Sequence, residues 1–476
     1  MSDSNWKKGL REIVGAGQLL EDPILLDSYG TDGYTLEKAR PSAVVLPADR
    51  EQLHAVVSHL YRERVPYVAR GAGTSLSGGA IPLDGAVVVH LSRMHQIRSI
   101  DWYNRVAYCE PGVVNRKLSE ALAPFGYYYA PDPSSQQACT LGGNVAENSG
   151  GPHCLKFGVT LNHIKQLEVV WPNGDVELLG SLADFAESVD VKSLMVGSEG
   201  MLGIVSGIWA RIVELPQSRA TTMVLFDDVQ EASQAVSAII AAGVIPAALE
   251  LMDPLAIEAV ERGVYRVGYP PGVAAVLLVE VDGPAPEVKE EQSLITHLLG
   301  KFPTRDIRIA RSAAERELWW ANRKTAFGAM GLLAPRYYVQ DGVIPRSQLP
   351  SALRKIGEIG EHYDIRIANV FHAGDGNLHP LLLYDDKDAH MVQRVRQAGS
   401  EILRMCLALG GSITGEHGVG LEKMEELTWQ MSPAVIQAQW ALKNACDPEG
   451  LANPKKVLPV GSTCLAELSS DVTRVK

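Results

Sequence analysis

The hydrophobic pattern divides the first half of the chain into short strands and a helix. Residues 41–47 and 65–69 are β-branched runs, and residues 51–64 carry apolar side chains at helical spacing. Residues 164–179 alternate on either side of Asn173-Gly174, a dipeptide that favours a type I′ turn in a β-hairpin. Because a hairpin is antiparallel, this pattern does not fit a doubly wound nucleotide-binding fold.

From about residue 218 the pattern changes to helices that alternate with strands. Residues 230–243 and 285–302 have helical periodicity. Strands are predicted at 274–281, 306–310, 337–344, 365–371 and 379–385. The order is typical of an α+β domain with helices over an antiparallel sheet. The most apolar stretch, residues 235–249, contains Gly243 and Pro246, so it predicts a helix, a turn and a strand instead of a membrane span.

Length and charge narrow the class of protein. A chain of 476 residues is too long for one ordinary core, so we expect two or three domains. The net charge of −12 argues against nucleic-acid binding, since no basic stripe is available for phosphates. The 6 cysteines form no CxxC pair, which excludes the usual zinc and iron–sulfur spacings. Residues 1–14 lack an apolar core, so we expect a cytoplasmic protein with free thiols.

Two glycine-rich segments are candidates for ligand binding. Residues 70–80 have Leu76 where a dinucleotide-binding fingerprint needs its third glycine, and they also lack the ending of a Walker motif. This segment is either a plain loop or a backbone nest for a diphosphate. Residues 131–151 are polar, aperiodic and too long for a simple connection, which is typical of a functional loop.

A third segment, NVFHAGDGNLHP at residues 369–380, places His372 and His379 at the two ends of a turn. Alone, the pair is either two metal ligands or two turn histidines. Residues 411–420 add Glu416, and two imidazoles with a carboxylate suit Zn²⁺, Fe²⁺ or Mn²⁺. His417 is then free to act as a base, and Asp375 is expected either to support a metal ligand or to cap the turn.

The motifs together identify the chain as similar to the FAD-linked 2-hydroxyacid dehydrogenases of the vanillyl-alcohol-oxidase superfamily. The resemblance is strongest to the branch that holds the FAD subunits of bacterial glycolate oxidases and the D-lactate dehydrogenases. It runs through RGAGTSLSGGA, the long loop 128–158, GSEGMLGI, DGVIPR, NVFHAGDGNLHP and GEHGVG. It implies an α+β fold, with a PCMH-type FAD-binding domain of two α+β subdomains and a cap domain whose antiparallel sheet is covered by helices. The expected division is 1–217 for the FAD domain, 218–412 for the cap, and 413–476 for a segment that carries metal and base residues and returns to the FAD domain.

The resemblance also implies which residues hold non-covalent FAD. The diphosphate would contact the first loop, at Arg70, Gly71, Ala72, Gly73, Thr74, Ser75, Leu76, Ser77, Gly78 and Gly79. The flavin would be lined by Pro131, Asp132, Ser135, Thr140, Gly142, Gly143, Asn144, Asn148 and Gly150. The adenosine side would meet Glu199, Gly203 and Ile204, and Asn453 would return to the flavin domain. His153 is a candidate for covalent attachment, because related flavoproteins attach FAD through histidine.

For catalysis, the resemblance implies that His372, His379 and Glu416 bind a divalent metal, that His417 is the base and that Arg323 binds the substrate carboxylate. The residue pattern alone leaves Arg323 either stacked beside its tryptophans or gripping a carboxylate. The expected reaction is metal-assisted deprotonation of a 2-hydroxy acid and hydride transfer to flavin N5.

Relatives that act on D-2-hydroxyglutarate have a lysine and a polar residue where this chain has Val339, Gln340 and Leu381, which favours glycolate or D-lactate. The alternatives are D-2-hydroxyglutarate oxidation, a flavin-bearing subunit without turnover, and a metal-only hydrolase that would leave the glycine loops unexplained. Electrons would pass to an iron–sulfur subunit, a second FAD-like subunit, an electron-transferring flavoprotein or quinone. The expected location is cytoplasmic, with peripheral contact at the inner face of the membrane or a homodimer both compatible with the sequence.

Overall fold

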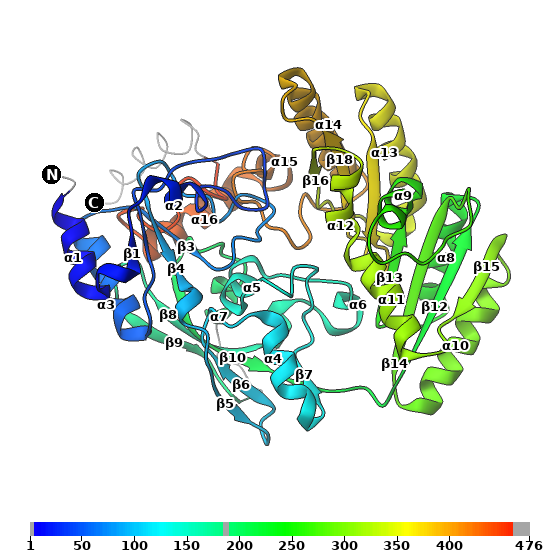
Figure 1. Cartoon of the computed structure of the whole chain (residues 1–476), viewed down its shortest axis with the longest axis horizontal. Coiled ribbons are helices and arrows are strands. Elements are labelled where there is room, and N and C mark those ends of the chain that lie inside the picture. The colour runs from blue at the N-terminus through cyan, green and yellow to red at the C-terminus, as the bar shows by residue number, and fades with distance from the viewer. Residues whose placement is uncertain (1–3, 184–189, 460–476) are drawn as a thin grey trace.

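The computed structural model describes residues 4–183 and 190–459. Two halves lie side by side, and the C-terminal helices lie next to the N-terminal half (Figure 1). The fold class predicted from the sequence is confirmed. The domain boundaries after residues 217 and 412 stay a prediction. Within the described part of the chain, no helix combines the length and apolarity needed to cross a bilayer.

The N-terminal half contains two larger sheets and helices packed on them. The first sheet has the order β1-β2-β4-β3, and its last three strands are parallel. Its strands are β1 (Leu19–Leu20), β2 (Ala43–Val45), β3 (Tyr67–Arg70) and β4 (Val87–His90). The helices of this half are α1 (Ser4–Val14), α2 (Pro23–Asp27), α3 (Arg50–Arg62), α4 (Asn115–Leu122), α5 (Leu141–Glu147), α6 (Cys154–Phe157) and α7 (Lys192–Met195).

The second sheet is antiparallel and has the order β5-β6-β10-β8-β9. Its strands are β5 (Ile97–Asp101), β6 (Val106–Cys109), β8 (Ile164–Val170), β9 (Val176–Gly180) and β10 (Ile204–Arg211). A small two-stranded sheet joins β7 (Tyr127–Tyr128) to β11 (Val213–Glu214).

The predicted hairpin at residues 164–179 is confirmed as β8 and β9, but the predicted turn type is wrong. Only Gly174 of the turn has a positive φ, of 95°, whereas a type I′ turn needs positive φ at Asn173 as well. The N–H of Gly174 donates to the Trp171 carbonyl, and the N–H of Trp171 donates to the Asp175 carbonyl. Pro172 fixes a negative φ at the start of the loop, so the chain uses a three-residue loop with glycine in the left-handed position.

The cap half is built on a seven-stranded antiparallel sheet of order β15-β12-β14-β13-β17-β18-β16. Its strands are β12 (Ser218–Phe226), β13 (Ala248–Met252), β14 (Ala275–Gly283), β15 (Thr304–Ile309), β16 (Arg336–Val339), β17 (Ile367–His372) and β18 (Pro380–Tyr384). The cap and C-terminal helices are α8 (Val229–Ala241), α9 (Pro254–Arg262), α10 (Ala285–Leu299), α11 (Ala313–Lys324), α12 (Ala326–Ala329), α13 (Leu349–Tyr363), α14 (Ala389–Ala408), α15 (Leu427–Gln430) and α16 (Pro433–Cys446).

Both faces of the cap sheet are buried. Along β12, Val224 and Phe226 pack with α8, α10, α13 and α14, whereas Met223 and Leu225 pack with α9, α11 and α12. Successive side chains of a strand point to opposite faces, so a strand covered on both faces reads as an unbroken apolar run. This explains the continuous hydrophobic runs in the second half of the sequence.

The end of the described chain returns to the first sheet. The N–H of Tyr67 donates to the Leu451 carbonyl at 2.9 Å, and the N–H of Asn453 donates to the Tyr67 carbonyl at 2.8 Å. The ammonium of Lys443 on α16 donates to the carbonyls of Met201 and Ala452. Residues 447–459 thereby add to the N-terminal half after the chain has passed through the cap. The cysteines in the described ranges are free thiols, and Cys464 lies outside those ranges.

Candidate functional site

A cavity of about 540 Å³ has walls from both halves of the molecule. The cap and C-terminal side of its wall consists of Lys324, Phe327, Gly328, His379, Glu416 and His417. Most of the residues predicted to hold FAD form the opposite side. They are Arg70, Gly71, Ala72, Gly73, Thr74, Ser75, Leu76, Gly79, Ser135, Thr140, Gly142, Gly143, Asn144, Glu199, Gly203 and Ile204.

The other predicted FAD residues lie outside the cavity lining, in the layer that supports it. They are Ser77, Gly78, Pro131, Asp132, Asn148, Gly150 and Asn453. The carbonyl of Ser77 accepts from the N–H of Leu421, and the amide of Asn453 donates to the carbonyls of Gly79 and Glu199. The contacts of Ser77 and Asn453 hold the loops together, and contact of all seven residues with a cofactor stays a prediction.

The glycine-rich loops approach each other at backbone distance. A Cβ placed on Gly71 would lie 2.3 Å from Oγ1 of Thr140, the residue that caps α5. Gly73 has a φ of +69°, a conformation that favours glycine. Any side chain at Gly71 would therefore push the two predicted FAD loops apart. The cradle fits an extended cofactor that needs close contact with the backbone.

The predicted metal ligands meet at one point beside this cavity. Nε2 of His379 lies 3.0 Å from Oε1 of Glu416, and Nε2 of His372 lies 3.3 Å from the same oxygen. Candidate ligand atoms of all three residues lie within 4.8 Å of one another. The turn between the histidines is closed as predicted, because Oδ1 of Asp375 accepts from the N–H of Asn377. Two buried imidazoles and a carboxylate are a donor set that suits a divalent transition metal.

Arg323 and Glu250 lie behind His372, outside the cavity lining. The Glu250 carboxylate accepts from Nδ1 of His372 at 2.8 Å and forms an ion pair with the Arg323 guanidinium. Arg323 is only 2% exposed, and its Nε has no hydrogen-bond partner. Its predicted contact with a substrate carboxylate stays a prediction, and in this arrangement the guanidinium faces Glu250.

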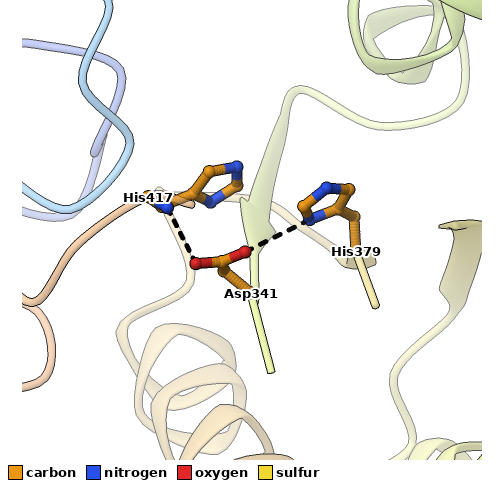
Figure 2. Close-up of side chains that lie close together, drawn as sticks. All are labelled: Asp341, His379 and His417. Atoms are coloured by element: carbon orange, nitrogen blue, oxygen red, sulfur yellow. Dashed lines mark hydrogen bonds and ion pairs between the residues drawn. The ribbon is translucent and has the colours of Figure 1, made fainter. Parts of the chain in front are cut away.

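The GEHG segment is fixed by Asp341, which follows β16. One carboxylate oxygen of Asp341 accepts from the backbone N–H groups of Gly415, Glu416 and His417 and from the Thr414 hydroxyl. Figure 2 shows Asp341 between His417 and His379. The rings of the two histidines are stacked, with centroids 4.8 Å apart.

The histidines at this site differ in charge. Burial lowers the pKa of His417 to about 4, although Asp341 opposes the shift, so this imidazole is neutral near pH 7 and can accept a proton. Burial also acts against a charged His372, but Glu250 and Glu416 outweigh it and raise its pKa well above the usual value. In the protein without a metal ion, a protonated His372 thus neutralises part of the surrounding carboxylate charge.

His153 is held between carboxylates and does not line the cavity. Its Nδ1 lies 2.9 Å from Asp132, and its Nε2 lies 3.7 Å from Glu280. Burial opposes protonation, but Asp132 and Glu280 dominate and raise the pKa of His153 to about 9. A protonated ring has no lone pair with which to attack a flavin, which argues against covalent attachment through this residue.

Sequence reasoning missed Glu250, Lys324 and the role of Asp341. The signal for Glu250 was a lone carboxylate in the apolar run of β13, where an unpaired charge would be costly. Lys324 lines the cavity and contacts Asp132 at 2.9 Å, and its only signal in the sequence is its place next to Arg323. The position of Asp341 in the DGVIP segment does not indicate its contacts with residues 414–417.

Comparison with known proteins agrees with this arrangement. A family model described as "FAD binding domain" matches residues 41–180, and one described as "FAD linked oxidases, C-terminal domain" matches residues 215–457. The chain belongs to the FAD-linked oxidase family. The resemblance predicted from the sequence is confirmed.

Among its relatives is the glycolate oxidase subunit GlcD of Escherichia coli (strain K12), which is 44% identical over 96% of this chain and 91% of its own length. The GlcD subunit of Bacillus subtilis (strain 168) is 38% identical over 90% of this chain and 91% of its own length. A D-lactate dehydrogenase of Anaerostipes hadrus is 28% identical over 94% of this chain and 96% of its own length.

Solved structures show the same fold at low sequence identity. A p-cresol methylhydroxylase with substrate bound aligns over 94% of this chain and 95% of its own, with a TM-score of 0.80 and 16% identity. An alkyldihydroxyacetonephosphate synthase aligns over 96% of this chain and 86% of its own, with a TM-score of 0.78 and 18% identity.

Proposed function

We propose that the protein oxidises a small 2-hydroxy acid, glycolate or D-lactate, to the 2-oxo acid with FAD as the first electron acceptor. One observation carries this proposal. The cavity lined by the FAD loops is also lined by His379, Glu416 and His417, so cofactor, metal ligands and base would share one space. The relatives named glycolate oxidase subunit and D-lactate dehydrogenase support oxidation of this class of substrate.

The acidity of the substrate decides what the site must supply. An alcohol is far too weak an acid for an imidazole alone, and general-base catalysis contributes about 3–5 kcal/mol. Bound FAD would supply the hydride acceptor, and a bound divalent ion would supply an acidifying shift of up to about 11 kcal/mol, by analogy with water whose pKa falls from about 15.7 to about 7. His372, His379 and Glu416 would hold this ion. His417, neutral and facing the cavity, would take the hydroxyl proton on its ring nitrogen.

Two cations are candidates for the substrate carboxylate. Arg323 is implied by the family resemblance, and it would have to leave or share its contact with Glu250. Lys324 lines the cavity directly, where it contacts Asp132. A kinetic comparison of Arg323→Met with Lys324→Met would assign the carboxylate to the residue whose loss raises KM more.

One feature of the cavity wall favours a small substrate. Phe327 lines the cavity beside His379, with ring centroids 5.6 Å apart, and an aromatic wall suits a hydrogen or a methyl group at C2. The three positions that favour a small substrate in the sequence lie outside the cavity. Val339 and Leu381 are buried in the cap core, and the side chain of Gln340 donates a hydrogen bond to Glu422. The alternative, D-2-hydroxyglutarate, needs a partner for its second carboxylate. Lys324 could serve only if it left Asp132.

The reduced cofactor would be reoxidised by another protein. No CxxC pair exists in the sequence, so the chain has no conventional iron–sulfur cradle of its own. The word "subunit" in the names of the GlcD relatives supports partner subunits. An iron–sulfur subunit, a second FAD-like subunit or an electron-transferring flavoprotein would then pass electrons onward to quinone, from a cytoplasmic protein at the inner face of the membrane.

The test is anaerobic mixing of the purified flavoprotein with each acid while the flavin absorbance is followed. We expect glycolate or D-lactate to bleach the flavin, and His372→Ala to retain the flavin but lose at least 10³-fold in bleaching rate. Ser218→Ala, at the start of β12, serves as the control and should bleach like the original protein. A His372→Ala protein that is free of metal and still turns over at the full rate would overturn the metal-assisted scheme. A wild-type flavin that no hydroxy acid reduces would favour a non-catalytic subunit.

A further inference from the structure

Asp341 is a fully buried carboxylate whose donors come from one short segment. Its Oδ2 accepts from the Thr414 hydroxyl at 2.6 Å and from the N–H groups of Gly415, Glu416 and His417 at 2.9, 3.1 and 2.8 Å. Asp341 itself is 0% exposed. Four donors are more than one buried carboxylate oxygen requires to satisfy its hydrogen bonding. The contact instead determines the path of residues 414–417.

The segment that Asp341 fixes carries both kinds of functional side chain. Glu416 is a proposed metal ligand and His417 is the proposed base, and each donates its own backbone N–H to the carboxylate. His379, the second metal histidine on this side, has its Nδ1 3.8 Å from Oδ1 of Asp341 and its Nε2 3.0 Å from Glu416. Figure 2 shows the carboxylate beside the two rings, where it faces the backbone of His417 and the ring of His379.

We propose that Asp341 is the positioning residue of this active site. It sets the backbone from which Glu416 and His417 project, so that metal ligand and base are held in fixed relation before substrate enters. It also faces Nδ1 of His379, which leaves Nε2 of that ring directed toward Glu416. This inference rests on the proposed function, which it extends to a residue outside the cavity lining.

A different role for Asp341 has to be separated from this one. Asp341, His379 and His417 also have candidate ligand atoms within 4.8 Å of one another, so Asp341 could itself bind a cation. The geometry favours positioning, because four donors already surround Oδ2 and the N–H of Glu416 also lies 3.4 Å from Oδ1, so the carboxylate as a whole faces donors of residues 414–417. Such a cation would use Nδ1 of His379, whereas the predicted metal ligands meet at Nε2 of the same ring.

The test uses the FAD-loaded full-length protein, stripped of metal with a chelator and titrated with Co²⁺ while the visible absorption of the ion is followed. Asp341→Asn keeps the shape and one acceptor oxygen but loses the charge-assisted bonds, which are about twice as strong as neutral ones. We expect Co²⁺ affinity to fall by about 10–100-fold, the usual effect of losing a group that orients metal ligands. At saturating Co²⁺ the absorption bands should match those of the original protein, and kcat should fall more than KM rises.

Asp375→Asn is the matched control. Asp375 is a carboxylate on the histidine-bearing turn, and its side chain caps that turn through the N–H of Asn377. The Asp375→Asn substitution removes the same charge from the neighbourhood without loosening residues 414–417. Its effect on Co²⁺ affinity should therefore be at least fivefold smaller than that of Asp341→Asn. Thr414→Val removes one of the four donors and should weaken Co²⁺ binding by a few fold, which keeps the inference testable if Asp341→Asn does not fold.

Four results would overturn the inference. Unchanged Co²⁺ affinity and unchanged kcat in Asp341→Asn would show that the segment needs no such anchor. Altered Co²⁺ absorption bands in Asp341→Asn at saturation would show that Asp341 is itself a metal ligand. Equal losses of Co²⁺ affinity in Asp341→Asn and Asp375→Asn would show that the effect comes from net charge alone. Wild-type protein that binds no Co²⁺ would overturn the metal site together with this inference, whereas wild-type protein that binds Co²⁺ but oxidises no hydroxy acid would overturn the proposed function alone.

Discussion

Two buried carboxylates, Glu250 and Asp253, differ in whether a cation faces them. Glu250 lies against Arg323 and His372, and these partners outweigh burial and lower its pKa. Asp253, which caps α9, meets only neutral donors, from Ala256 and from Asn369. Burial therefore dominates at Asp253 and raises its pKa from 3.8 to about 6.

This difference predicts a pH-dependent effect of Asp253→Asn. The folded state binds the Asp253 proton more tightly than the unfolded state, so the associated stability is present below about pH 4 and is lost as pH rises through about 6. The loss corresponds to at most about 3 kcal/mol. We therefore expect the stability difference between the variant and wild type, measured by urea unfolding at pH 4 and at pH 7, to shift in favour of the variant at pH 7. Asp228→Asn, at an exposed cap of α8, should show no such gain. An equal difference at both pH values for Asp253→Asn would contradict the argument.

Single residues also show where sequence reasoning succeeds and where it stops. His372 and His379 could be paired because one tight turn joins them, and Glu416 followed from a glycine-flanked motif. Glu250 is hydrogen-bonded to His372 but lies 122 positions away along the chain. No local pattern records which strand neighbours which. The buried partners of a site therefore become visible only once the sheet order is known.

At the scale of elements, periodicity predicted several helices and strands, among them α3, α8 and α10, but not their ends. The predicted strand at residues 337–344 stops as β16 at Val339. Beyond Val339, the side chain of Gln340 donates a hydrogen bond to Glu422, and the carboxylate of Asp341 accepts from the GEHG segment. Val343 forms only isolated β-bridges. Side-chain contacts with a distant segment override strand propensity here.

The contact between the two glycine-rich loops predicts the effect of Gly71→Ala. The added Cβ would lie 2.3 Å from Oγ1 of Thr140, so the loops must separate. We expect FAD affinity to fall at least tenfold, measured as the ratio of flavin to protein absorbance after dialysis. Gly331→Ala meets nothing within 4 Å and should keep its flavin. Full flavin retention in Gly71→Ala would mean that this contact does not shape the cradle.

At the scale of the whole molecule, ion pairs join the cap to the N-terminal half. Lys156 on α6 contacts the carboxylate and the carbonyl of Asp282 on β14, each at 2.5 Å. Asp132 and Glu280 face His153 from opposite halves. The order of the seven cap strands and these contacts depend on pairings between distant residues, which hydrophobic periodicity does not encode. The presence of two halves could be predicted, but their docking could not.

Lys156→Met tests this docking. The side chain of Asp282 is only 4% exposed, so the substitution leaves a nearly buried carboxylate without its cation. We expect a loss of about 1–3 kcal/mol, below the 3–5 kcal/mol of a fully buried pair because Lys156 is 31% exposed. Thermal unfolding of Lys156→Met and of Lys156→Met/Asp282→Asn would measure the loss and its partial recovery. Lys38→Met, in an exposed pair with Asp27, should change stability by less than about 1 kcal/mol. A Lys156→Met protein as stable as Lys38→Met would show that this pair does not hold the halves together.

The return of residues 447–459 to β3 has a consequence for synthesis on the ribosome. The glycine-rich loops of the cradle emerge early, but the backbone N–H groups that hold Glu199 belong to Val419 and Gly420, and the bridge to Tyr67 comes from Ala452. A nascent chain that has exposed only the first 400 residues lacks these contacts as well as Glu416 and His417. We therefore expect the cradle to be complete only after residues 419–452 have been synthesised.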